Sequence, residues 1–415
     1  MLHGHRKRRG LTQRELADLA TLSVRAVRNL ERGGALRPRR ETVRLLAEVL
    51  RLSAEQREQF ESAAFPEALD AGPWESLVAP PPAPTTPLVG RTVELNALVR
   101  LLTDDGHRCL KVVGPAGVGK TRLLQELAGE LYGRYEWPAI WWTGEPGAAA
   151  ELARTVGDRD VLLVVDGPAA DPADLAALSR RCPGLRIVAA SRRPEPDSDG
   201  PLRAVPLGAL GLPPEYGPEG TADPEALGKY PAVRVLMSNA RRFVPSFRLD
   251  PQTADAVVTI CRRLDGLPRA LEHAAEWLLT FPPSDLVELA RQDPLTLASS
   301  PAAPGSTDTT RAELFDSLAS LTLPQRSLLE QLARRPGPWT SADGTGQAPA
   351  DPGTVRAVYA LHLRGLLRSD SGMLRSRFTV LNLVRALCES EERQCAAEGS
   401  AGLPQGLPLV GHRPA

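Results

Sequence analysis

Cysteine is scarce in this chain, and its spacing argues against two classes of site. The 415 residues include five cysteines: Cys109, Cys182, Cys261, Cys388 and Cys395. None of them forms a C-x-x-C pair, and their number is odd. This argues against a structural zinc site and against a disulfide framework. The usage predicts a protein of the reducing cytoplasm.

Long apolar runs are also missing. Spanning a bilayer takes about 18 or more consecutive apolar residues, and no run here approaches that length. The first residues carry charges where a signal peptide has its apolar core, so we expect neither secretion nor contact with a membrane. With 42% hydrophobic and 24% charged residues the composition is that of a globular protein, and the length predicts roughly two to four domains.

Lysine is nearly absent, and the basic residues are almost all arginine. The chain has four lysines: Lys7, Lys111, Lys120 and Lys229. The net charge is zero, but residues 1–60 hold 14 Lys and Arg against 7 Asp and Glu. A basic head on a mildly acidic remainder predicts a polyanionic partner for the head alone.

The order of strand and helix signals predicts several domains. Residues 1–65 read as short helices, and the proline-rich stretch that follows predicts a linker over 66–87. In residues 88–215 apolar runs rich in Val and Ile alternate with helical stretches, which predicts a parallel sheet covered on both faces. The expected strands are 109–114, 139–144, 161–167 and 185–191.

Strand signals fade after about residue 205. Residues 216–300 read as helices broken by Pro and Gly, and 301–396 as a further helical unit with a hairpin at 373–382. The tail, 397–415, is rich in Gly, Pro and Ala, which predicts disorder.

A glycine loop stands between the first expected strand and a helix. It fits G-x-x-x-x-G-K-[ST] without a mismatch and consists of Gly114, Pro115, Ala116, Gly117, Val118, Gly119, Lys120 and Thr121. Glycines let backbone N–H groups turn around phosphate oxygens, and the following helix directs its positive end to the same anion. We expect Lys120 to reach the outer phosphates, Thr121 to ligate Mg²⁺, and Arg122 to border the site.

A second metal ligand is expected at the end of a neighbouring strand. "VLLVVDG" supplies five apolar residues and then Asp166, whose carboxylate would hold Mg²⁺ through water. Gly167 stands where many such ATPases carry a second acid, which predicts slow or absent hydrolysis. Arg192 follows the next strand and is a candidate contact for a γ-phosphate, with a solvated arginine as the alternative.

The basic head carries a helix-turn-helix pattern. Thr12 and Glu15 fit a capping box, and Leu16, Leu19 and Ala20 fall on one face of the first helix. Ser23 is placed to cap the second helix, with Val27 and Leu30 turned inward. The residues expected to contact DNA are Gln13, Ser23, Val24, Arg25, Arg28, Asn29 and Arg39. The alternative is a plain helical bundle or a protein-docking domain.

Both halves resemble known families. Residues 6–60 resemble the lambda-repressor-like (XRE-type) helix-turn-helix, with "LTQRELA" and "LERG" in register. The resemblance implies that Gln13 contacts phosphate and that Val24, Arg25 and Asn29 face bases.

Residues 88–395 resemble the core of STAND-class, NB-ARC-like ATPases. The motifs are "LVGRTVEL", the glycine loop, "LLVVDG", "AASRR", "LDGLPRALEHAA" and "RFTVLNLVRAL". This resemblance implies a P-loop NTPase with a helical lid (216–300) and a winged-helix domain (301–396), holding ATP or ADP with Mg²⁺. It also implies that the segment Leu88–Arg91, with Val89, Gly90 and Arg91, borders the adenine and that Pro268 closes over the nucleotide.

The chain departs from the STAND pattern at two points. Leu381-Asn382 stands where the winged-helix segment usually carries His-Asp, whose histidine senses ADP. The long repeat sensor of the family is not part of these 415 residues, so we expect a separate sensor protein or a small inducer acting on the core.

The leading hypothesis from the sequence is a nucleotide-switched transcription factor. ADP would keep it closed, and ATP with Mg²⁺ would favour a homo-oligomer whose paired heads bind double-stranded operator DNA. Two alternatives remain open. One is an immune or stress signalling ATPase, and the other is a scaffold whose P-loop binds nucleotide only for stability.

Overall fold

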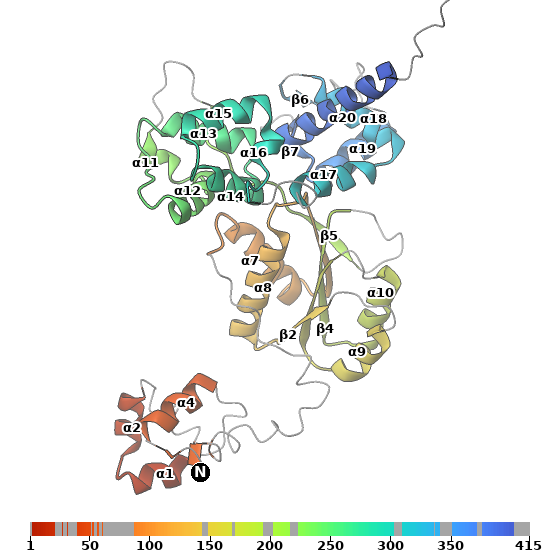
Figure 1. Cartoon of the computed structure of the whole chain (residues 1–415). Helices are drawn as coiled ribbons and strands as arrows, with labels where there is room; N and C mark the ends of the chain where they lie inside the picture. The colour runs from red at the N-terminus through yellow and green to blue at the C-terminus, as the bar shows by residue number, and fades with distance from the viewer. Residues whose placement is uncertain are drawn as a thin grey trace, which may run out of the picture. The chain divides into compact units, whose positions relative to one another are not determined.

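The computed structural model of this chain describes residues 2–20, 27, 31, 40–50, 52–53, 56–57, 60, 87–142, 148–167, 171–193, 202–215, 223–302, 309–335, 337–340, 351–371 and 376–401. The chain divides into two compact units, Met1–Val78 and Ala79–Ala415. Figure 1 labels their helices and strands.

The first unit is helical. Its described helices are α1 (Leu2–Arg8), α2 (Gln13–Leu19) and α4 (Arg40–Val49). The expected capping box is confirmed, because Thr12 and Glu15 each accept a hydrogen bond from the other's backbone N–H. Leu16, Ala20 and Val27 are buried together. Leu19 departs from the prediction: its side chain is 61% exposed, and Ala17 fills the inward position instead.

A five-stranded parallel sheet forms the centre of the second unit. Its strands are β1 (Cys109–Val113), β2 (Ala139–Trp142), β3 (Val161–Asp166), β4 (Leu185–Ser191) and β5 (Arg203–Pro206). They pair in parallel in the order β2-β3-β4-β1-β5. The strand that ends in Asp166 is therefore not the immediate neighbour of β1, because β4 lies between them.

Helices cover both faces of the sheet, as the continuous apolar strands predict. They are α7 (Thr92–Thr103), α8 (Lys120–Tyr135), α9 (Ala148–Val156) and α10 (Pro172–Arg181). In Figure 1, α7 and α8 lie on one face and α9 and α10 on the other. Strand β5 was not predicted, because it is a half-exposed edge strand that ends in proline and lacks a continuous apolar run.

Residues 223–302, called the helical segment below, contain no strand among their described residues. The helices are α11 (Pro224–Leu227), α12 (Pro231–Phe243), α13 (Ala254–Arg263), α14 (Pro268–Trp277), α15 (Pro283–Gln292) and α16 (Pro294–Leu297). All except α13 begin with proline, which lacks the N–H that a first helical turn leaves unpaired. The prolines that break the sequence pattern therefore start helices.

Residues 309–401, called the C-terminal segment below, combine helices with a small sheet. The elements are α17 (Thr309–Ala319), α18 (Leu323–Ala333), β6 (Trp339–Thr340), α19 (Pro352–Leu363), β7 (Leu367–Ser371), β8 (Ser376–Val380) and α20 (Asn382–Ala401). The antiparallel sheet has the order β6-β8-β7, so the hairpin begins earlier than the expected 373–382. Helix α20 continues to Ala401, into the stretch predicted to be disordered.

One continuous core joins the sheet, the helical segment and the C-terminal segment. Leu110 of β1, Leu271 of α14 and Leu383 of α20 all belong to the same cluster of buried side chains. Within the part of the chain that the structure describes, no helix is long and apolar enough to cross a membrane.

Candidate functional site

The glycine loop has a backbone that other residues would adopt only with strain. Gly117 and Gly119 have φ angles of 71° and 96°, in the left-handed region. A Cβ at Gly114 would lie 2.4 Å from the carbonyl oxygen of Leu207. Helix α8 begins at Lys120, directly after the loop, so its positive end lies at the loop.

Lys120 is turned into this loop. Its ammonium group donates hydrogen bonds to the carbonyl oxygens of Gly114 (3.0 Å) and Pro115 (2.9 Å). The pKa of Lys120 is lowered to about 8, mainly by burial and then by the charge of Arg192, whereas Glu313 and Asp166 act to raise it. The half-buried ammonium therefore lies where additional negative charge would be stabilising.

A cavity of about 1680 Å³ brings most of the predicted nucleotide residues together. Those that line it are Val89, Arg91, Ala116, Gly117, Val118, Gly119, Lys120, Thr121, Arg122, Asp166, Arg192 and Pro268. Gly90, Gly114 and Pro115 are not among its lining residues. Gly90 lies against the helical segment instead, since a Cβ there would come within 2.3 Å of the Pro231 Cβ.

Asp166 and Arg192 reach the cavity from the carboxyl ends of β3 and β4. Asp166 is paired with Ala190 in the sheet, and Arg192 directly follows β4. The Nη1 atom of Arg192 is buried and has no hydrogen-bond partner. An unpaired buried guanidinium nitrogen is costly unless an anion comes to it.

Arg91 connects separate parts of the site through hydrogen bonds to other residues. Its guanidinium donates to the Glu94 carboxylate (2.9 Å) and to the carbonyl oxygens of Val118 (3.2 Å) and Gly208 (2.7 Å). The side chain is only 5% exposed. These contacts connect the loop to the chain that leaves β5.

The helical segment contacts the loop at the start of α14. The backbone N–H of Arg269 donates to the carbonyl oxygen of Gly117 (3.2 Å). A Cβ at Gly117 would lie 2.9 Å from the Arg269 Cβ, and one at Gly119 would lie 3.9 Å from Pro268. Pro268 and Arg269 therefore form one wall of the cavity.

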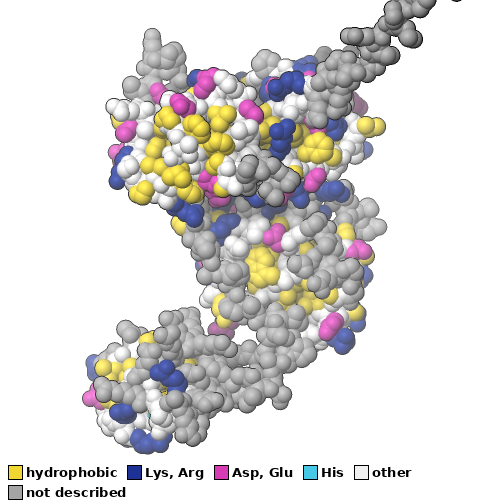
Figure 2. Space-filling view, viewed as in Figure 1, with side chains coloured by type: hydrophobic (Ala, Val, Ile, Leu, Met, Phe, Trp, Pro, Cys, Tyr) yellow, Lys and Arg dark blue, Asp and Glu magenta, His cyan; other side chains and the backbone are white. Residues whose placement is uncertain are grey.

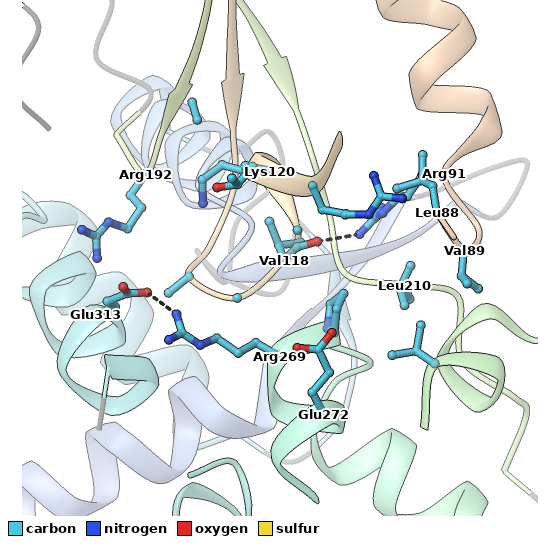
Figure 3. A pocket seen from close by; sticks show the side chains of 18 of the residues that line it. Leu88, Val89, Arg91, Val118, Lys120, Arg192, Leu210, Arg269, Glu272 and Glu313 are labelled. Carbon is cyan, nitrogen blue, oxygen red and sulfur yellow. Dashed lines mark hydrogen bonds and ion pairs between the residues drawn. The ribbon is translucent and has the colours of Figure 1, made fainter. Parts of the chain in front are cut away.

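Several charged residues of the cavity were not predicted from the sequence, among them Arg269, Glu272 and Glu313. Arg269 and Glu313 form an ion pair of 3.8 Å across it (Figure 3). Glu272 of α14 also lines the cavity, and burial raises its pKa. Arg269 could have been found from its place next to Pro268, but Glu313 lies in no motif.

The C-terminal segment also reaches the loop. Gly365 follows α19 with a φ of 69°, and a Cβ there would come within 2.4 Å of the Pro115 Cδ. Arg364, 4% exposed, donates to the Ser320 hydroxyl (2.7 Å). The loop is thus packed between three stretches of chain.

Leu381 and Asn382, which replace the expected His-Asp, lie away from the glycine loop contacts just described. Leu381 is buried. The Asn382 amide donates to the Arg262 carbonyl (2.8 Å) and to the Asp265 carboxylate (3.1 Å). Asn382 therefore joins the C-terminal segment to the helical segment.

In the head, Gln13 is hydrogen-bonded to an ionic cluster. Its amide donates to Glu31 (2.6 Å), which also accepts from the Arg6 guanidinium. The exposed cations of α1 and α2 are Lys7, Arg8 and Arg14, and Figure 2 shows basic side chains spread over this surface. The other predicted DNA contacts lie outside the described residues: Ser23, Val24, Arg25, Arg28, Asn29 and Arg39.

Comparison with known proteins gives a family match for the head and two relatives that align with most of the chain. Residues 5–56 match the family model described as helix-turn-helix. The chain is 30% identical over 276 residues to "Uncharacterized protein Rv0894" of Mycobacterium tuberculosis, and the match covers 60% of this chain and 65% of that protein. It is 27% identical over 309 residues to "Putative HTH-type transcriptional regulator Rv0890c" of the same organism, covering 67% of this chain and 33% of the relative. The chain therefore spans less than two thirds of each of these relatives.

Two solved structures give distant matches. The ORC2 protein of Aeropyrum pernix, solved in ADPNP–ADP complexes, matches with a TM-score of 0.38 and 14% identity, over 78% of this chain and 97% of that one. A STAND protein with a tetratricopeptide repeat sensor from Pyrococcus horikoshii matches with a TM-score of 0.28 and 15% identity, over 76% of this chain and 46% of that one. The matched head, the order of the parallel strands and the glycine loop together show that the chain joins a helix-turn-helix to a core with a P-loop ATPase fold.

Proposed function

We propose that the chain is a DNA-binding transcriptional regulator of the STAND class whose DNA binding is controlled by ATP and ADP. One observation carries the proposal. Lys120, Asp166 and Arg192 come from three different elements and line one cavity beside the glycine loop. Such a convergence of a lysine, a carboxylate and an arginine is the arrangement that nucleotide phosphates require.

The residues present fit a nucleotide with Mg²⁺. The glycine loop leaves no room for side chains at Gly114, and the buried Nη1 of Arg192 lacks a partner that an anion would supply. Lys120 would exchange its two carbonyl partners for phosphate oxygens. The Thr121 hydroxyl and the Asp166 carboxylate are the oxygen ligands that Mg²⁺ prefers, and the bound ion would neutralise phosphate charge.

The same geometry supports a switch with little turnover. Gly167 follows Asp166 at the cavity and carries no side chain to polarise water. The helical segment and the C-terminal segment both pack on the loop. In this proposal the closed form holds ADP, and a triphosphate favours an open form that assembles and places two heads on two DNA half-sites. A separate sensor protein or a small inducer would shift the same equilibrium.

The test is to measure duplex DNA affinity and oligomeric mass of the full chain with ADP and with a non-hydrolysable ATP analogue. The DNA is a site selected from random duplexes. We expect the analogue to raise both quantities and Lys120→Ala to abolish the response. Lys229→Ala is the control, because Lys229 is exposed and does not line the cavity.

Three other results would change the assignment. Equal DNA affinity and equal mass under both nucleotides would eliminate the switch. Binding to DNA without sequence preference, with hydrolysis stimulated by DNA, would favour the signalling ATPase. Thermal stabilisation by nucleotide with no change in mass would favour the scaffold.

A further inference from the structure

Helix α17 brings a carboxylate from the C-terminal segment into the cavity. Glu313 has a side chain that is 30% exposed, and its Oε2 lies 3.8 Å from the Nη1 of Arg269. Its charge also raises the pKa of Lys120, against the effect of burial. Glu313 therefore lies within electrostatic range of the lysine that the glycine loop provides.

Arg192 completes a group of cations that faces this carboxylate. In Figure 3 its side chain extends from the end of β4 toward Glu313. Lys120, Arg192 and Arg269 thus come from the loop, the sheet and the helical segment, and Glu313 approaches them from a fourth element. A terminal phosphate bound by Lys120 and Arg192 would share this space with Glu313.

We propose that Glu313 makes the closed cavity select a nucleoside diphosphate over a triphosphate. This inference rests on the proposed function. A third phosphate adds negative charge to the cavity that the Glu313 carboxylate lines, and like charges repel each other. The closed form therefore binds the triphosphate more weakly, and the triphosphate favours conformations in which α17 has moved away from the loop. Glu313 would supply the discrimination that Leu381-Asn382 does not.

A purely structural role for the Arg269–Glu313 ion pair would instead predict that variants without it are less stable and keep the same nucleotide preference. Arg269 and Glu313 have side chains that are 38% and 30% exposed, and pairs of such exposure contribute little to stability. Removing the charge of Glu313 should therefore leave the fold intact. It should change which nucleotide is preferred.

The experiment compares Glu313→Gln with Glu313→Asp and Asp285→Asn in the full chain. Calorimetry with Mg²⁺ gives the Kd of ADP and of a non-hydrolysable ATP analogue for each variant. We expect Glu313→Gln to raise the affinity for the triphosphate relative to the diphosphate by about tenfold. Glu313→Asp keeps the charge and should keep the wild-type preference.

Asp285→Asn is the matched control. Asp285 lies in the first turn of α15, is exposed and does not line the cavity. Its removal changes the net charge equally and should leave the preference unaltered. The thermal midpoints without nucleotide should be nearly equal in all four proteins, and the effect of Glu313→Gln should weaken with added salt.

Two outcomes overturn this inference alone: wild-type protein that binds both nucleotides with a preference unchanged in Glu313→Gln, or an equal change in Asp285→Asn. Wild-type protein that binds neither nucleotide would overturn the proposed function and this inference together.

Discussion

The carboxylate of Asp265 accepts hydrogen bonds from the backbone N–H groups of Asn382 (2.9 Å) and Leu383 (3.0 Å). A residue of the helical segment thereby caps α20, whose first N–H groups would otherwise lack partners. Arg368 donates to the Asp265 carbonyl from the other side. This contact fixes the C-terminal segment to the helical segment next to the turn that carries Pro268.

Asp265→Asn should change the pH dependence of stability. Burial raises the pKa of Asp265 to about 6 from 3.8, against the hydrogen bonds from Leu383 and Asn382. The folded state therefore binds this proton more tightly than the unfolded state, and wild-type stability rises as pH falls from about 6 to about 4. Asparagine does not titrate, and it tolerates the positive φ of 56° at this position.

Urea unfolding from pH 4 to pH 8 checks this prediction. The wild type should gain on the order of 2 kcal/mol over Asp265→Asn between pH 6 and pH 4. The difference should be constant above pH 7. Parallel curves for the two proteins across the whole range would contradict the assignment.

Gly365→Ala should loosen the packing of the C-terminal segment on the loop. The new methyl group would overlap the Pro115 ring, and the positive φ adds backbone strain of about 1–3 kcal/mol. Gly106→Ala is the control, because Gly106 has the same φ of 69° with nothing within 4 Å of the new carbon. Hydrogen exchange should show faster exchange in α19 and the glycine loop for Gly365→Ala only.

Arg192→Ala should weaken triphosphate binding more than diphosphate binding. A charge-assisted hydrogen bond of this kind contributes about 1.5–3 kcal/mol, so the expected loss is about tenfold to a hundredfold. Removing the Arg192 charge should also raise the pKa of Lys120. Arg180→Ala on the exposed face of α10 serves as control; an equal loss for both nucleotides would place Arg192 away from the terminal phosphate.

Glu31→Gln should destabilise the head. The hydrogen bond from Arg6 is the main cause that lowers the pKa of Glu31 from 4.5 to about 2. The contribution of Glu31 to folding stability is therefore fully present above pH 4.5 and is lost as the pH falls toward 2. Both side chains of the pair are 5% exposed, and breaking such a pair costs about 3 kcal/mol. In Glu31→Gln, the backbone amide hydrogens of α1 and α2 should exchange with solvent faster than in the wild type at pH 7.

The control for this prediction is Glu130→Gln. Glu130 pairs with Arg134, but these side chains are 41% and 60% exposed, so their pair contributes little. Equal protection of the head in wild type and Glu31→Gln would show that the cluster around Gln13 is dispensable for folding.

The sequence predicted the elements whose chemistry is local. Four sheet strands, the helix after the glycine loop and the capping box of Thr12 and Glu15 follow from periodicity and capping rules. The edge strand β5 was missed because it lacks the apolar run of a central strand. Leu19 was misplaced because its exposure depends on which neighbours pack on α2, and spacing along one helix does not specify that.

The charged lining of the cavity was only partly predictable. Lys120 and Asp166 stand at fixed places in motifs, so their convergence could be expected from topology. Glu313 lies in an ordinary amphipathic helix, and only the packing of α17 brings it opposite Arg269. Likewise, Asp265 was part of a recognised motif, but its partner Asn382 follows 117 positions later.

The contact of Gly365 with Pro115, together with that of Arg269 with Gly117, has a thermodynamic consequence. Because separate stretches of chain pack against the glycine loop, release of the proposed nucleotide and separation of these stretches would be linked equilibria. Any effector that pulls α19 or α14 off the loop must lower ligand affinity by the same factor by which the ligand lowers affinity for the effector. A signal could therefore act on this protein from a distance without entering the cavity.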